Sequence, residues 1–142
     1  MKNMLRLTVA LTALLFSLPS LRAEDATPAA ETELTFSLPA NLKAEDVVTA
    51  AAKAFTDANW LGVAAQNNTV VAFIDHNHVK VKATAVCTTS EVKVSAEYKG
   101  AGERWGTPAD AKANVDRWLR IFARNTKRNL RLASAKDGQN TN

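Results

Sequence analysis

A short histidine motif is the part of the sequence with the clearest capacity for metal chemistry. His76 and His78 are separated by one residue, and Asp75 precedes them. On an extended strand, residues i and i+2 share a face, so the two imidazoles could chelate zinc or copper with Asp75 as an oxygen ligand. If His76 and Asn77 instead form a tight turn, that shared face is lost. The motif therefore supports either a metal site or a structural, solvent-exposed role.

An arginine and a tryptophan stand together in a glycine-rich loop. Arg104 and Trp105 lie in residues 100–106, which hold three of the five glycines of the chain, and Tyr98 comes shortly before them. A guanidinium group beside aromatic rings predicts a site where a ligand stacks or binds through a cation–π contact. The alternative interpretation is that Trp105 folds back over the open end of the hydrophobic core.

The single cysteine, Cys87, excludes an intramolecular disulfide framework and a thiolate zinc cluster. It follows Val81, Ala83 and Ala85 at alternate positions of a predicted strand, so its side chain is predicted to point into the core with theirs. We interpret it as a small buried residue, because a reactive thiol needs exposure and a nearby base.

The sequence contains no recognisable catalytic motif. It lacks a glycine-rich phosphate loop followed by a lysine, a serine in an elbow motif, and paired carboxylates in a known catalytic context. We therefore favour a binding protein over an enzyme and expect no cofactor.

Six cations follow one another at helical spacing near the end of the chain. At about 100° per residue they cover one side of a predicted helix, and apolar residues cover the opposite side. From Pro108 onward the chain has eight basic and three acidic residues. This basic stripe predicts a docking face for an anionic partner, such as an envelope component or an acidic protein; the alternative is a solvated face whose cations complement the helix dipole. The six residues are Arg117, Arg120, Arg124, Lys127, Arg128 and Arg131.

Residues 1–23 have the pattern of a secretory signal peptide. Lys2 and Arg6 precede an apolar run over residues 7–18, and Ala23 supplies the small residue expected at a cleavage site. We predict an exported protein, periplasmic or secreted, with no membrane span after cleavage; the alternative is an uncleaved N-terminal anchor. No cysteine directly follows the run, so lipid anchoring is not expected. The chain beyond residue 23 is nearly neutral, which argues against a nucleic-acid partner.

Hydrophobic periodicity predicts the elements that hold these residues. Apolar side chains alternate in five segments and recur at helical spacing in two, and Thr107, Pro108 and Asp110 form a helix-start signal. The predicted fold is α+β, an antiparallel meander with two helices packed on one face, in the order β-α-β-β-β-β-α. The predicted strands cover residues 33–38, 60–65, 69–75, 79–87 and 91–99, and the helices residues 43–58 and 108–133.

One domain is predicted over residues 33–133. Residues 24–32 read as a flexible lead-in and residues 134–142 as a disordered tail, because both are polar and lack periodicity. Trp60 and Trp118 fall on apolar faces and are predicted to lie in the core.

Four motifs follow one another along the chain: an alanine-rich helix ending in a tryptophan, a histidine near a hairpin, a tyrosine closing the last strand, and a tryptophan in the final helix. They are Ala58-Asn59-Trp60, His78, Tyr98 and Val115-Asp116-Arg117-Trp118. Over residues 45–130 the chain resembles a family of small secreted or lipid-anchored bacterial domains of uncharacterised function. It departs from that family at Asn59, where glycine is usual, at Val115-Asp116, where Tyr-Asn is usual, and in lacking a lipid-bearing cysteine. The resemblance implies an exported α+β domain with no assigned activity.

These observations together predict an exported, non-enzymatic binding module that engages an anionic partner through the basic stripe. The alternative function is a small metal-binding protein that uses His76 and His78.

Overall fold

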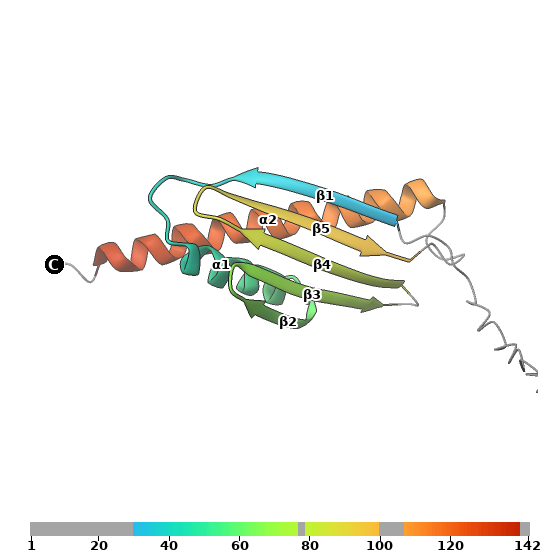
Figure 1. Ribbon diagram of the computed structural model, residues 1–142, viewed down its shortest axis with the longest axis horizontal. Helices are drawn as coiled ribbons and strands as arrows, with labels where there is room; N and C mark the ends of the chain where they lie inside the picture. The colour runs from blue at the N-terminus through green and yellow to red at the C-terminus, as the bar shows by residue number, and fades with distance from the viewer. Residues whose placement is uncertain (1–29, 77–78, 100–106, 140–142) are drawn as a thin grey trace, which may run out of the picture.

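The computed structural model describes residues 30–76, 79–99 and 107–139. Five strands and two helices follow one another in the predicted α+β order (Figure 1). The elements are β1 (Ala30–Ser37), α1 (Ala44–Asp57), β2 (Leu61–Gln66), β3 (Thr69–His76), β4 (Val79–Cys87), β5 (Glu91–Tyr98) and α2 (Pro108–Gln139).

The strands form one antiparallel sheet in the spatial order β1-β5-β4-β3-β2. Strands β2 to β5 form the predicted meander, and β1 pairs with β5 along its whole length, from Ala30 opposite Tyr98 to Ser37 opposite Glu91. The first strand in the sequence therefore completes the sheet beside the last one, and β1 and β2 are its two edges.

One side of the sheet is buried, and we call it the covered side. On β5 buried residues alternate with exposed ones, with Ser95 half-buried, as the two-residue period of a strand requires. Phe122 of α2 stacks on Phe55 of α1 with ring centroids 4.1 Å apart, and it meets the edge of Phe36 of β1 at 6.1 Å. These three rings join both helices to the sheet at the centre of the core.

Small side chains lie on both surfaces where α1 approaches the strands. Ala72, Ala83 and Ala96 stand side by side across three strands and are fully buried. Because alanines fill little space, the alanine-rich helix can approach the sheet closely, and the larger rings fill the remaining volume. The buried alanines of α1 are Ala50, Ala51 and Ala54.

The predicted start of the final helix is confirmed by its hydrogen bonds. The Thr107 N–H and hydroxyl both donate to Asp110 Oδ2 at 2.9 Å, and the Asp110 N–H donates back to the Thr107 hydroxyl oxygen at 3.3 Å. This reciprocal arrangement satisfies backbone groups that the first turn of a helix leaves without partners. The bonds from Thr107 lower the pKa of the Asp110 carboxyl.

Asn59, two residues after the end of α1, has a positive φ of 60°. This left-handed conformation favours glycine, and asparagine is among the few other residues that adopt it readily. Asn59 is therefore compatible with the turn that leads into Trp60, whose ring is buried with its centroid 5.1 Å from that of Phe55.

Two predicted boundaries are wrong. Helix α2 continues past Ala133 to Gln139, because no proline or glycine interrupts it before Gly138, and the Ser134 hydroxyl donates to the Leu130 carbonyl at 3.1 Å. Strand β1 begins at Ala30, inside the segment expected to be a lead-in, because pairing with β5 extends that far. The predicted signal peptide at residues 1–23 lies outside the described residues.

Within the described part of the chain, no helix combines the length and the apolar character needed to cross a bilayer.

Candidate functional site

The six cations of the predicted stripe form one exposed side of α2, which we call the basic face. All of them are exposed except Lys127, which is half-buried. The residues that α2 buries, including Val115, Leu119 and Phe122, lie on its other side. The basic face consists of Arg117, Arg120, Arg124, Lys127, Arg128 and Arg131.

Most cations of the basic face have no ion-pair partner among the described residues. Among the described residues, Arg128 is the only member that forms an ion pair, with its Nη2 3.3 Å from Asp57 Oδ2. Lys127 Nζ lies 5.5 Å from the centre of the Phe36 ring, a cation–π contact that holds the lysine beside β1. Most of the positive charge is therefore available to a ligand.

Two adjacent hollows follow the basic face. One, of about 350 Å³, is lined by Arg117, Arg120, Ile121 and Arg124. The other, of about 510 Å³, is lined by Arg124 and the last three members of the basic face, with Ala123 as its apolar wall. Arg124 lines both hollows, so the two hollows adjoin each other along the basic face.

Asp57, the last residue of α1, connects the two helices beside the basic face. Its carboxylate accepts from Lys53 Nζ at 2.7 Å and from Asn129 Nδ2 at 3.3 Å, in addition to its pair with Arg128. The hydrogen bond from Lys53 is the main cause that lowers the pKa of Asp57. Asn129 Nδ2 also donates to the Ala50 carbonyl at 3.3 Å. These contacts fix one border of the basic face to α1.

Asp116 fixes the opposite border to β1. It accepts hydrogen bonds from the Thr32 hydroxyl and, at 2.6 Å, from Lys112 Nζ. Burial acts to raise the pKa of Asp116, but the bonds from Lys112 and Thr32, with the nearby charge of Arg120, outweigh it and lower the pKa.

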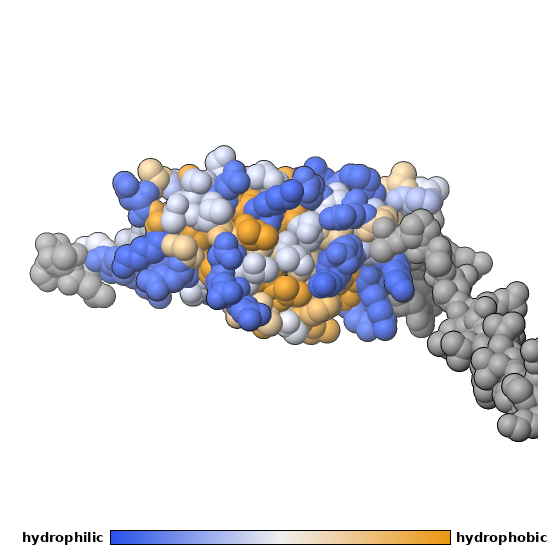
Figure 2. All heavy atoms as spheres, viewed as in Figure 1, coloured by the Kyte–Doolittle hydropathy of each residue, from blue (hydrophilic) through white to orange (hydrophobic). Residues whose placement is uncertain are grey.

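The exposed side of the sheet, which we call the open side, has a second feature that sequence reasoning missed. Leu61, Phe73 and Val86 are 58%, 43% and 40% exposed there. Figure 2 shows hydrophobic residues grouped among charged ones in the middle of the visible face. The signal was present in β3, where Val71 and Phe73 are apolar at positions that alternation assigns to solvent.

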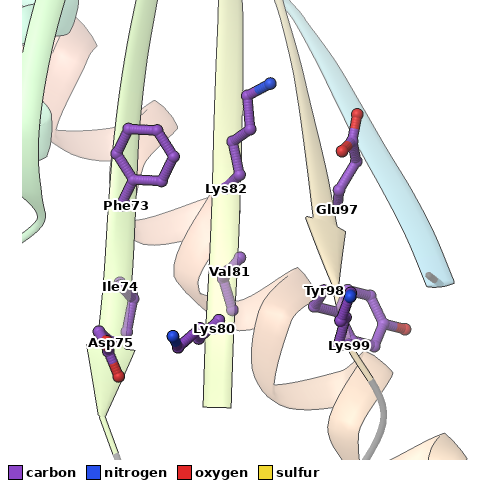
Figure 3. Close-up of a pocket in the computed structure, with 9 residues that line it drawn as sticks. All are labelled: Phe73, Ile74, Asp75, Lys80, Val81, Lys82, Glu97, Tyr98 and Lys99. Carbon is purple, nitrogen blue, oxygen red and sulfur yellow. The ribbon is translucent and has the colours of Figure 1, made fainter. Parts of the chain in front are cut away.

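A hollow of about 490 Å³ lies beside this apolar group. Figure 3 shows Phe73, Lys82 and Glu97 on three adjacent strands at its lining, with Asp75, Lys80 and Lys99 below them in the view. Buried or half-buried residues complete the lining: Ile74, Val81 and Tyr98.

The metal and stacking candidates are only partly described. Asp75 is exposed at the end of β3, where it stands opposite Lys80, and His76 pairs with Val79 through the backbone. The side chain of His76 and the whole of His78 lie outside the described residues, as do Arg104 and Trp105. Tyr98 is 5% exposed and belongs to the core. The described residues contain no group of three or more potential metal ligands.

The three remaining core predictions differ in outcome. Cys87 is buried, as predicted, and burial raises the pKa of its thiol to about 11. Trp60 is also buried, whereas Trp118 is half-buried and packs against the core rather than within it.

Comparisons with known proteins give no identification: no protein-family model matches the chain, and the search of curated proteins found no match.

Proposed function

We propose that the protein is an exported binding module whose basic face docks on the phosphate-bearing head groups of an anionic lipid surface. The observation that carries the proposal is the exposed, nearly uncompensated row of cations on α2, with Arg128 its only ion-paired member in the described structure. Exposed cations that are not neutralised by the protein itself attract polyanions from solution.

The shape of the basic face favours an extended surface over a small ligand. Arg117 and Arg131 are separated by about 21 Å along the helix axis, at about 1.5 Å per residue. The cations lie along a convex helix side, and the two hollows between them share Arg124. A layer of lipid phosphates can contact all of these cations at once, whereas a single small anion would contact two or three.

Binding should be electrostatic rather than insertive. The apolar side of α2 packs against α1 and the sheet through Phe122 and Leu119, so it cannot enter a bilayer without unfolding the domain. Lysines and arginines close to an anionic membrane surface each contribute about 1 kcal/mol to binding it, and salt screens that attraction. Export, which the N-terminal sequence predicts, would bring the protein to such surfaces.

The proposal is tested by sedimenting the protein with phosphatidylcholine vesicles that contain or lack phosphatidylglycerol. We expect binding only to the anionic vesicles, with loss of binding as salt is raised. The double variant Arg120→Glu, Arg124→Glu should bind at least about tenfold more weakly, because it reverses two adjacent charges.

A matched variant separates the basic face from net charge. Lys43→Glu with Lys136→Glu changes the net charge equally but alters exposed residues outside the basic face. We expect it to retain most of the binding. Equal loss in both variants would show that only net charge matters, and binding to DNA or to an acidic polypeptide without binding to anionic vesicles would replace the lipid surface by that partner; either result overturns the proposal.

A further inference from the structure

The open side of the sheet carries an apolar group that the described chain does not cover. Leu61 stands opposite Phe73 in the β2–β3 register, and Val71 lies two residues before Phe73 on the same strand. Val86 lies on the neighbouring strand β4, two residues after Thr84, which pairs with Val71. A contiguous apolar group on a sheet face is a common feature of protein interaction sites.

The outward residues of β5 and its extension have an unusual charge order. Glu91, Lys93, Ser95, Glu97 and Lys99 occupy successive outward positions, and all are exposed except the half-buried Ser95. Their charges read negative, positive, neutral, negative, positive. In the opposite direction the order is positive, negative, neutral, positive, negative, so each charge is replaced by its opposite and Ser95 stays at the centre. The row is therefore complementary to a reversed copy of itself.

We propose that the open side of the sheet binds the same side of a second copy of this chain about a twofold axis. Two sheets pack face to face with their strands within about 30° of alignment. A twofold axis that lies between the sheets, perpendicular to the strands and level with Ser95, reverses each strand over its own equivalent. Glu91 then faces Lys99 of the second copy, and Lys93 faces Glu97 of the second copy.

The same axis brings Val71 of the apolar group to the centre of the contact, with Phe73 opposite Thr69 of the second copy. Ser95, Thr84 and Val71 lie at one level of the ladder, since Ser95 pairs with Thr84 and Thr84 pairs with Val71. Val71 therefore meets Val71 of the second copy near the axis. Val86 is set opposite Lys82 of the second copy, which is one of the residues that line the 490 Å³ hollow. The axis therefore buries Val71 and Val86 against the second copy.

The area of the face is adequate for a specific dimer. Five strands about 4.8 Å apart, with about eight residues each at about 3.4 Å, give a face of about 650 Å² before side chains corrugate it. Standard interfaces bury about 800 Å² on each partner. Lys93 pairs with Glu33 at 3.0 Å, and Glu33 is level with Ser95 in the register, so the axis sets Glu33 opposite Glu33 of the second copy. Lys93 of each copy lies beside these two carboxylates and offsets their repulsion.

Charge exchange between Lys93 and Glu97 provides a decisive test, with mass measured by sedimentation across a range of protein concentrations. The natural chain should be a concentration-dependent dimer. Lys93→Glu and Glu97→Lys should each raise the dimer dissociation constant at least about tenfold, because twofold symmetry places like charges together twice. A one-to-one mixture of the two single variants should form a heterodimer, since both contacts then join opposite charges. The double variant should dimerise with itself.

Further variants separate this surface from the others. Phe73→Ser should also weaken the dimer, whereas Arg120→Glu with Arg124→Glu should leave it unchanged, so failure of the lipid proposal and failure of this one are distinguishable. Circular dichroism verifies that each variant is folded. A natural chain that stays monomeric, or a dimer that the changes at Lys93, Glu97 and Phe73 do not affect, would overturn the inference. Absence of rescue in the mixture would overturn the twofold geometry.

Discussion

The covered and open sides of the sheet are built on the same strands but differ in what fixes their residues. On β4 the covered side carries Val81, Ala83 and Cys87, each at most 1% exposed, whereas the intervening Lys82 is exposed. The covered side must match the volumes of two helices, so its residues are small and closely packed. The open side has no such constraint within one copy, and the proposed dimer would use its charge order and its apolar group.

The largest effect should come from truncating the ring at the centre of the covered side. Phe122→Ala removes contacts with both Phe55 and Phe36, and we expect it to lower the free energy of unfolding by about 3–5 kcal/mol. Phe73→Ala on the open side is the matched control. Urea denaturation at a protein concentration below the dimer range should show a loss of less than about 1 kcal/mol for it. Similar losses of unfolding free energy at the two positions would show that Phe73 stabilises the monomer as much as Phe122 does. That result would contradict the distinction between a covered and an open side.

A smaller, pH-dependent effect is expected where the covered side ends at β1. Because the pKa of Asp116 is lowered in the folded state, its stabilising contribution is complete above about pH 4 and is lost as the pH falls through the folded pKa. Asp116→Asn keeps an acceptor for Thr32 but removes the charge that Lys112 binds, and it should cost about 1 kcal/mol at pH 7.

The difference between Asp116→Asn and the natural chain should disappear in urea denaturation near pH 2. Asp75→Asn, which alters an exposed carboxylate of the open side, is the matched control and should leave the stability nearly unchanged at pH 7. A deficit for Asp116→Asn that is equally large at acid pH would mean that the carboxylate charge does not stabilise the fold.

The sequence was sufficient to predict features that depend on local patterns. The alternation of β4 and β5 predicted their covered sides, and the signal at Thr107 and Asp110 predicted the start of α2. Helical spacing likewise predicted that the arginines of the basic face would share one exposed side.

Features that depend on distant parts of the chain were not predictable in this way. The pairing of β1 with β5 and the contacts of Asp57 with Arg128 and of Thr32 with Asp116 join residues more than fifty positions apart. Periodicity describes which side of an element is apolar but not what packs against it. For the same reason it assigned Trp118 to the core, although its ring lies at the border of that core and is half-buried.

The prediction with the smallest expected effect concerns thiol reactivity at positions 86 and 87, which are adjacent on β4. Cys87 points to the covered side, and burial raises the pKa of its thiol to about 11, so at pH 8 only about one molecule in a thousand carries a thiolate. We expect no reaction with a thiol reagent such as dithionitrobenzoate until the protein unfolds. In a Cys87→Ala background, Val86→Cys should react rapidly, because residue 86 is 40% exposed on the open side. Slower labelling of Val86→Cys at high protein concentration would place that position in the proposed dimer, whereas rapid labelling of Cys87 in the folded chain would contradict the distinction between the two sides.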